Sequence, residues 1–334
     1  MQAAVLHETG NLTVDEVPTP QCGRKEVLIK VEAATICRTD LKMYRHGQRD
    51  LVLPRILGHE VVGTVFEVGR EVVGVFEGDR IQVAPAFSCG RCRFCMKGGF
   101  NCCENISIPG FSYDGGFSEY MLLPESAILS GSLNPIPCSL PFEEAALAEP
   151  VACCINGVER VGIEFGDTVL IVGGGPIGNI FYQLCGIAGA SRVLLVEIFP
   201  ERVEFIQRHE LNVVDSIESV QEEFDILIPA CPDPDALIKG IKKVRKHGKV
   251  LAFSGLSASD PAILDPNIIH YNELLMAGAY GCTPWQNREA LTLMASRRLD
   301  LRYLLTDQIS LGEILDGLRL VEEKRGMKVV IRNV

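Results

Sequence analysis

The sequence lacks the features of a secreted or nucleic-acid-binding protein. Its first twenty residues, MQAAVLHETGNLTVDEVPTP, contain no basic leader, no apolar run and no small-residue cleavage site, so we expect no signal peptide. It has no basic run either, and its net charge of −11 argues against a nucleic-acid partner. No repeat or low-complexity segment interrupts the 334 residues. These absences predict a globular cytoplasmic protein, long enough for roughly two domains.

Charge is also absent from residues 168 to 191, the stretch TVLIVGGGPIGNIFYQLCGIAGAS. Its length matches a membrane span, but it contains six glycines, a proline, an asparagine and a glutamine. The pattern instead divides into a strand, a turn and a helix. It predicts a buried unit and no membrane partner.

Cysteine is abundant, with thirteen residues, and five of them lie in the run CGRCRFCMKGGFNCC. An odd, widely spread set is not typical of a secreted disulfide framework, which favours a reducing compartment. Cys89, Cys92 and Cys95 are separated by two-residue gaps, and Cys103 follows after seven more residues. Four such thiolates can close a tetrahedron around Zn²⁺, with Cys102 left over; the alternative is a redox CxxC pair or free thiols. We expect a structural zinc site in a lobe at about 86–105.

The pattern of the sequence changes near residue 150, which predicts two domains of an α/β protein. Residues 1–150 contain short strand-like runs such as EVLIKVEAA and VVGTVFEVG, separated by Gly and Pro, as in a small, partly closed β-barrel. Residues 151–284 alternate between buried strands and helices, as in a doubly wound parallel sheet. Residues 285–334 become helical and end in the extended MKVVIRNV, which we expect to return to the first domain.

A glycine-rich turn predicts a dinucleotide site in the second domain. In VGGGPIG, Gly173, Gly175 and Gly178 have GxGxxG spacing between a predicted strand and a predicted helix. The first glycine permits a tight turn, the second lets a pyrophosphate approach the backbone, and the third allows close helix–strand packing. Free N–H groups at the helix N-terminus, where Pro176 and Ile177 lie, would face the anion. The alternative is a glycine-rich turn that binds no ligand.

An acidic residue indicates which dinucleotide is bound. Glu197 closes the next predicted strand, 19 residues after Gly178. A carboxylate there accepts hydrogen bonds from ribose hydroxyls and repels a 2′-phosphate, which favours NAD over NADP. Ile198 and Phe199 follow, so no adjacent arginine attracts that phosphate.

Four further residues form a candidate catalytic zinc set in the first domain. Cys37 lies in ATICRTDLKMY, His59 and Glu60 lie in LGHEVVG, and Glu149 lies in ALAEPVACC. Thiolate, imidazole and carboxylate ligands suit a catalytic Zn²⁺ that keeps one position open for water or substrate. The alternatives are that Cys37 is a buried small hydrophobe and that Glu149 is one more charge on an acidic helix.

Together, GHE before a Gly-rich strand, the cysteine run, YDGGFSEY and the late GxGPIG resemble the zinc-dependent medium-chain dehydrogenase/reductase superfamily over essentially the whole chain. The sequence is most similar to the branch of sorbitol (polyol) dehydrogenases and L-threonine 3-dehydrogenases. The resemblance implies a GroES-like catalytic domain made of 1–150 and 285–334, with a Rossmann NAD-binding domain, 151–284, inserted between them. It also implies two zinc ions per chain, NAD, and a symmetric homodimer or homotetramer.

The resemblance assigns roles by motif. Cys37 and His59 match catalytic zinc ligands, Glu60 matches the acid beside the histidine, and Glu149 stands where classical alcohol dehydrogenases have a third cysteine. It does not distinguish whether Glu60 or Glu149 binds zinc directly while the other holds its water. The predicted catalytic residues are Cys37, Thr39, His59, Glu60 and Glu149. The predicted cofactor-binding residues are Arg38, Gly173, Gly175, Pro176, Ile177, Gly178, Glu197, Arg202, Ser254 and Gly255.

Two residues depart from the polyol branch. Arg38 follows the first ligand where most polyol enzymes have glycine, as in classical alcohol dehydrogenases, where that arginine holds the NAD pyrophosphate. Lys42 replaces a histidine that ends a proton relay or orients the substrate in relatives. A protonated lysine is a poor relay, so Lys42 either favours an anionic substrate or is a solvated charge.

The expected reaction is hydride transfer to NAD from a secondary alcohol, such as a polyol, a sugar alcohol or a sugar derivative. Amino-alcohol oxidation, as in the threonine branch, and classical alcohol dehydrogenase activity are alternatives. A zinc-free quinone reductase and a non-catalytic NAD-binding protein share the scaffold and are alternatives of other kinds. The apolar strand LLMAGAY, residues 274 to 280, is expected at the outer edge of the second domain's sheet, where it would join a second copy.

Overall fold

The computed structural model describes residues 1–256 and 260–332, which form two compact units. Unit 1 comprises Met1–Ala152 and Gly281–Val334, and unit 2 comprises Cys153–Tyr280. Unit 1 contains a mixed sheet and a smaller antiparallel sheet, whereas unit 2 contains a six-stranded parallel sheet. The predicted fold class, a barrel-like β-domain with a doubly wound parallel-sheet domain, is confirmed.

Unit 1 is built on a seven-stranded sheet. Its strands are β3 (Val27–Thr35), β5 (Glu60–Val68), β6 (Arg80–Val83), β7 (Tyr120–Leu123), β8 (Leu133–Pro135), β15 (Leu305–Ile309) and β16 (Lys328–Arg332). Neighbours follow the order β15-β16-β3-β5-β6-β8, and β7 pairs with β3. A three-stranded sheet contains β1 (Gln2–Glu8), β2 (Asn11–Glu16) and β4 (Arg55–Ile56), with β1 in the middle.

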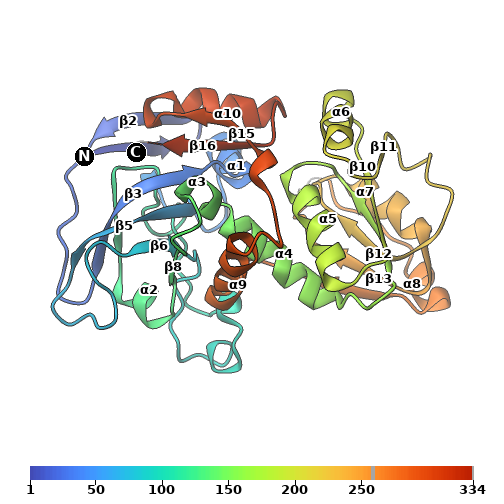
Figure 1. Ribbon diagram of the computed structural model, residues 1–334, viewed down its shortest axis with the longest axis horizontal. Coiled ribbons are helices and arrows are strands. Elements are labelled where there is room, and N and C mark those ends of the chain that lie inside the picture. The colour runs from blue at the N-terminus through green and yellow to red at the C-terminus, as the bar shows by residue number, and fades with distance from the viewer. Residues whose placement is uncertain (257–259, 333–334) are drawn as a thin grey trace. The chain divides into compact units, whose positions relative to one another are not determined.

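The end of the chain lies beside its beginning in unit 1 (Figure 1). Strand β16 pairs antiparallel with β3, so that Val330 lies opposite Thr35 and Ile331 lies opposite Ala34. Thr35 is two residues before Cys37. The C-terminal strand therefore lies next to the segment that delivers a predicted metal ligand.

Six helices belong wholly or partly to unit 1. They are α1 (Arg38–His46), α2 (Glu125–Leu129), α3 (Phe142–Ala145), α4 (Ala148–Val161), α9 (Pro284–Ala295) and α10 (Ile314–Glu322). Helix α4 begins in unit 1 and ends in unit 2. Helix α9 begins with a capping box. The hydroxyl of Thr283 accepts from the Gln286 backbone N–H, and the side-chain oxygen of Gln286 accepts from the Thr283 backbone N–H.

Burial of apolar strands forms the core of unit 1. Strands β3 and β5 bury most of their residues on both faces, and their core contacts include Phe87, Phe117 and Met121. Each such side chain contributes about 1.5–3 kcal/mol relative to an exposed position. This core fixes the positions of the loops that leave β3 and enter β5.

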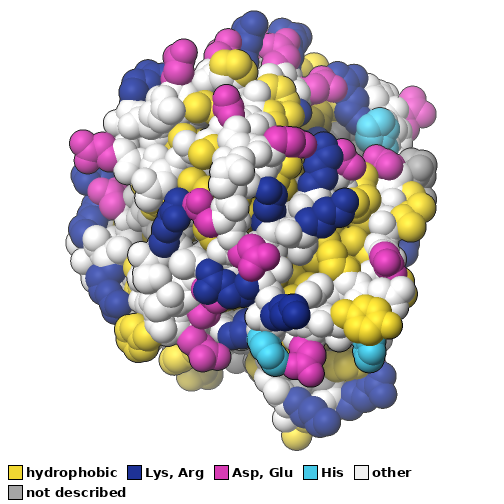
Figure 2. Space-filling view, turned by 90° about the vertical axis from the view of Figure 1, so that its right-hand side faces the viewer, with side chains coloured by type: hydrophobic (Ala, Val, Ile, Leu, Met, Phe, Trp, Pro, Cys, Tyr) yellow, Lys and Arg dark blue, Asp and Glu magenta, His cyan; other side chains and the backbone are white. Residues whose placement is uncertain are grey.

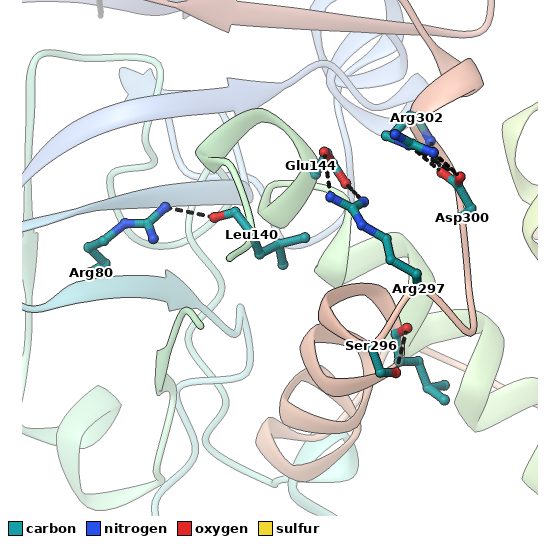
Figure 3. Close-up of polar contacts among 8 residues, drawn as sticks. Arg80, Leu140, Glu144, Ser296, Arg297, Asp300 and Arg302 are labelled. Atoms are coloured by element: carbon teal, nitrogen blue, oxygen red, sulfur yellow. Dashed lines mark hydrogen bonds and ion pairs between the residues drawn. The ribbon is translucent and has the colours of Figure 1, made fainter. Parts of the chain in front are cut away.

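One ion pair joins the C-terminal segment of unit 1 to its N-terminal part, and further polar contacts lie on either side of it (Figure 3). Arg297, after helix α9, forms an ion pair with Glu144 on helix α3, whose carboxylate is mostly buried. Arg302 pairs locally with Asp300 at 2.5 Å. Arg80, on β6, donates to the carbonyl of Leu140 at 2.7 Å, just before helix α3. The two chain segments of unit 1 are thus joined outside the core as well as within the sheet.

Unit 2 contains the strand–helix alternation that the sequence predicts. Its parallel strands are β9 (Thr168–Val172), β10 (Arg192–Val196), β11 (Val213–Val214), β12 (Phe224–Pro229), β13 (Val244–Ala252) and β14 (Leu275–Gly278). They lie in the order β11-β10-β9-β12-β13-β14, so β14 is at the predicted outer edge. Its helices are α5 (Pro176–Ala188), α6 (Pro200–Arg208), α7 (Pro234–Gly240) and α8 (Pro266–Asn272).

The uncharged stretch 168 to 191 forms strand β9, a glycine turn and helix α5, as predicted. Strand β9 has four buried residues among its five, which is typical of a parallel strand covered on both faces. Within residues 1–256 and 260–332, no helix is both long and apolar enough to cross a membrane.

Two glycines on helix α5 provide a matched test of the turn. A Cβ at Gly178 would lie 1.9 Å from the carbonyl oxygen of Gly173, whereas a Cβ at Gly186 would contact nothing within 4 Å. We expect Gly178→Ala to lower the free energy of unfolding by about 1–3 kcal/mol, because helix and turn must separate. We expect Gly186→Ala to raise it by about 0.5–1 kcal/mol. Urea titrations of both variants check this, and equal effects would contradict it.

Candidate metal centres and dinucleotide loop

The four predicted structural ligands come together in one cluster. The sulfur atoms of Cys89, Cys92, Cys95 and Cys103 all lie within 4.8 Å of one another. The Cys92 and Cys95 sulfurs are 3.5 Å apart, well beyond the roughly 2.05 Å of a disulfide bond. Cys102 is exposed and does not join the cluster.

Backbone amides support thiolates in this cluster. The N–H groups of Cys89 and Asn105 both donate to the sulfur of Cys103 at 3.3 Å. Hydrogen bonds from the backbone of Cys95 and Glu104 lower the pKa of Cys92 to about 6. Burial raises the pKa of Cys103 to about 12. The closed four-sulfur donor set fits Zn²⁺, which would displace the remaining thiol protons when it binds.

Three of the four predicted catalytic ligands also come together. One donor atom each from Cys37, His59 and Glu60 lies within 4.8 Å of the other two. Cys37 is the N-cap of helix α1, and its sulfur accepts from the Thr39 backbone N–H at 3.4 Å. His59 directly precedes Glu60, the first residue of β5. A helix start and a strand start therefore hold the three donors.

Asp40 connects two of these donors. Its Oδ2 accepts from the Cys37 backbone N–H at 2.8 Å, which completes the capping box of helix α1. Its Oδ1 lies 3.3 Å from Nδ1 of His59, and neither atom has a hydrogen-bond partner among the described residues. A carboxylate on one imidazole nitrogen leaves the other nitrogen for a metal, the arrangement usual around histidine ligands. The pair therefore fits a metal site.

The charges around His59 affect its titration. Burial lowers the pKa of His59, but the charges of Asp40 and Cys37 outweigh burial and hold the pKa well above its ordinary value. The ring also packs edge-on against Phe111, with centroids 5.8 Å apart. A proton on the ring competes with a metal ion, so metal loading is expected to weaken as the pH falls.

A buried lysine that the sequence reasoning missed lies at this centre. Lys328, the first residue of β16, forms an ion pair with Oε2 of Glu60. Thr35 donates its hydroxyl proton to the same oxygen. Burial lowers the pKa of Lys328, but the charges of Glu60 and Cys37 raise it above its ordinary value. The available sequence signal was one lysine in the otherwise apolar run KVVI.

The other residues predicted for this centre lie outside the group of three donors. Glu149 is buried on helix α4, and its carboxylate lies within 4.8 Å of the Cys282 sulfur, outside the Cys37 group. Thr39 is half-buried on the first turn of α1. Arg38 and Lys42 are exposed on the same helix.

The glycine loop of unit 2 has the geometry that its spacing predicts. Gly173 has φ +113°, which favours glycine, and Gly175 is the N-cap of helix α5, with Pro176 at its first position. Ile177 and Gly178 lie in the first turn, and no side chain caps this helix start; the first N–H groups of a helix have no partner within it. The loop fits an anion such as a pyrophosphate.

The Glu197 carboxylate holds this loop. Its Oε2 accepts from the Gly174 backbone N–H at 3.0 Å, and its Oε1 accepts from Ile198 and Phe199 at 2.8 and 3.0 Å. Glu197 is buried, and the next side chain, Ile198, is 65% exposed. A guanidinium nitrogen of Arg202 lies 3.4 Å from the position of a Cβ on Gly175. Charge of both signs thus borders the loop.

Ser254 and Gly255 follow strand β13 at its carboxyl end. Ser254 is half-buried and Gly255 is exposed. Ligands of open parallel sheets bind at this end of the strands, which is where the glycine loop also follows β9.

Comparisons with known proteins identify relatives of this chain. Residues 23–132 match the alcohol dehydrogenase GroES-like domain. Sorbitol dehydrogenase of Bacillus subtilis is 32% identical over 95% of this chain and 92% of its own length. L-galactonate-5-dehydrogenase of Escherichia coli is 32% identical over 87% of this chain and 86% of its own.

A solved structure resembles the whole chain. It is a zinc-binding dehydrogenase of Sinorhizobium meliloti bound to NADP, which is 31% identical to this chain. The two superpose with a TM-score of 0.90 over 99% of this chain and 98% of the other. Both units therefore have counterparts in one relative.

The two clusters predict two separable metal ions. Zinc-loaded protein should contain about two zinc ions per chain, and Cys92→Ser and His59→Ala should each contain about one. Cys92→Ser should also lower the melting temperature, because a closed zinc site contributes folding free energy. Cys102→Ser is the matched control and should retain both ions. Elemental analysis checks this, and a Cys102→Ser protein that loses zinc would contradict the assignment.

Proposed function

We propose that this chain, which belongs to the zinc-dependent medium-chain dehydrogenase/reductase superfamily, oxidises a secondary hydroxyl group of a polyol-like substrate with NAD as hydride acceptor. As an alcohol dehydrogenase of this superfamily, it is an oxidoreductase. The observation that carries the proposal is the group of Cys37, His59 and Glu60. Three protein ligands leave a fourth tetrahedral position open, as catalytic zinc sites require.

Each residue of the centre has a distinct task in this proposal. When bound, zinc supplies a Lewis acid for the alcohol hydroxyl, and the dinucleotide supplies the hydride acceptor. Cys37, His59 and Glu60 hold the metal, and Asp40 orients His59. The Thr39 hydroxyl and the Glu149 carboxylate are the candidate acceptors for the substrate proton.

We assign the two tasks to the two units. Unit 1, predicted as 1–150 and 285–334, holds the metal ions and is the catalytic domain. Unit 2, predicted as 151–284, carries the glycine loop and is the dinucleotide-binding domain. The cysteine lobe at 86–105 stabilises unit 1. Support comes from the two proposed ligand groups, both within unit 1, and from the loop geometry within unit 2.

We infer a polyol-like substrate from chemistry and from relatives. A carboxylate at the metal is a harder ligand than a third thiolate, and it suits substrates that offer oxygen atoms. The relatives named for sorbitol and for L-galactonate act on polyhydroxylated compounds, the second of them an anion. Lys42 is exposed, so it is available to an anionic group of the substrate and is otherwise a solvated charge. Arg38 is the residue that favours the classical alcohol dehydrogenase alternative.

We propose a homo-oligomer assembled through the edge of the unit 2 sheet. Strand β14 is at that edge, and Leu275 and Tyr280 are 56% and 61% exposed. Figure 2 shows hydrophobic side chains among charged ones on the side of the molecule that lies at the right of Figure 1. An exposed apolar edge strand invites pairing with another chain. Light scattering at micromolar concentration should give at least twice the chain mass, and a monomer would contradict the proposal.

Substrate preference and Glu149 form one test of the reaction. Vicinal diols and polyols should be oxidised faster than ethanol, measured as NADH absorbance. Glu149→Gln preserves volume and removes the charge near the centre, so it should lower kcat/KM about a hundredfold and spare NAD binding. Glu159→Gln, exposed on the same helix, is the control and should be active. Primary alcohols as the best substrates, or an unaffected Glu149→Gln, would support the classical alternative instead.

Coenzyme choice tests the role of Glu197. We expect NAD to be preferred over NADP, although one relative is seen with NADP. Glu197→Ser with Ile198→Arg should erode the preference about tenfold or more, because repulsion is lost and a phosphate partner is gained. Glu197→Gln is the control for loop support, since its amide oxygen still accepts a backbone N–H. Comparable kcat/KM with NADP in the unmodified protein would defeat the assignment.

A further inference from the structure

The ammonium group of Lys328 is enclosed within the candidate catalytic centre. Lys328 is 5% exposed and Glu60 is 1% exposed, so neither charge is solvated. The ammonium donates to the carbonyl oxygen of Ile36 at 3.2 Å and pairs with Oε2 of Glu60. Ile36 precedes Cys37, and Glu60 follows His59. Lys328 therefore contacts the backbone beside one proposed ligand and the side chain beside another.

The two oxygens of Glu60 have different surroundings. Thr35 and Lys328 both donate to Oε2. Among the described residues, none donates to Oε1. The carboxylate is thus bound on one side by a neutral donor and a charged one, and its other side is left for a metal ion.

The charge of Lys328 matters to Glu60 both before and after a metal ion binds. A buried carboxylate without a counter-ion is strongly destabilising, so a cation is needed beside Glu60 when no metal is bound. Lys328 supplies that cation. When a divalent ion arrives, it must share the carboxylate with the ammonium, and two nearby cations repel each other.

We propose that Lys328 is a positioning residue that holds Glu60 in place before the metal binds and weakens Glu60 as a ligand afterwards. The proposal rests on the metal-dependent function proposed above. In it, Lys328 keeps Oε2 occupied, so Glu60 meets the metal through Oε1 alone. The centre is preformed without its metal, and it binds that metal less tightly than three free ligands would.

Removing the ammonium tests this directly. In Lys328→Met, the metal-free protein should melt roughly 5 °C or more below the unmodified protein, because Glu60 loses its counter-ion. Zinc should restore most of that loss, since the metal becomes the only counter-ion. Release of the catalytic zinc to a chelator should be at least about tenfold slower. The catalytic zinc is recognised in this measurement as the phase of zinc release that the His59→Ala variant lacks.

Matched variants separate charge from packing. Lys328→Arg keeps a buried cation. It should melt near the temperature of the unmodified protein, and its zinc release rate should lie within about threefold of the unmodified rate. Lys249→Met removes a partly buried lysine that pairs with Glu164 in unit 2, and it should leave zinc release unchanged. Cobalt(II) at the catalytic site should show a changed visible spectrum in Lys328→Met and an unchanged one in Lys328→Arg, because only the first alters the ligand field of Glu60.

A second variant covers the case in which Lys328→Met does not fold without metal. Combining Lys328→Met with Glu60→Gln removes both charges and should recover the metal-free melting temperature. Failure of that double variant to recover stability would overturn the proposal, as would unchanged or faster zinc release from Lys328→Met. Release and melting need no substrate. A protein that shows the expected changes but oxidises no alcohol would refute the proposed reaction and leave the role of Lys328 intact.

Discussion

Buried charge is the constraint on which the centre in unit 1 depends. Asp40, His59, Glu60 and Lys328 are buried, and Cys37, beside them, is half-buried. Each ionised group in such a place is costly unless an opposite charge or a hydrogen bond compensates it. The structure supplies both kinds of compensation, through the helix cap at Cys37, the Asp40–His59 contact and the Lys328–Glu60 pair.

The topology of unit 1 brings the compensating groups together. The first ligand leaves the end of β3, and the second and third enter β5, the neighbouring strand. The compensating lysine comes from β16, which pairs with the other edge of β3 after the chain has formed unit 2 and returned. Residues about 270 positions apart in the sequence thus share one charge balance. The return of the tail is therefore part of the site and part of the fold.

Residue spacing predicted the motifs that lie within a short stretch of sequence, but it could not predict side-chain contacts between distant strands. The cysteine lobe and the glycine turn at Gly173 follow from short patterns, whose geometry is set within a few residues. The grouping of Cys37 with His59 and Glu60 was proposed from their ligand chemistry and then matched by the family resemblance, since no spacing rule links them. Lys328 was missed because its partner lies in a distant strand. Sequence also did not show that Glu197 accepts one backbone N–H from the glycine loop and two from the residues that follow it.

The sequence left undecided which of two carboxylates, Glu60 or Glu149, binds the metal directly. The structure groups Glu60 with Cys37 and His59 and places Glu149 beside Cys282. We therefore propose separate tasks for the two acids. Glu60 would hold the metal beside Lys328, and Glu149 is the candidate acceptor for the substrate proton.

Anomalous diffraction from zinc-loaded crystals, recorded at the zinc absorption edge, is the most direct test of this account. It predicts two peaks per chain, one among Cys89, Cys92, Cys95 and Cys103, and one within bonding distance of Cys37, His59 and Oε1 of Glu60. The ammonium of Lys328 should still lie on Oε2. A second peak beside Glu149 and Cys282, or no second peak at all, would contradict the assignment of the catalytic centre.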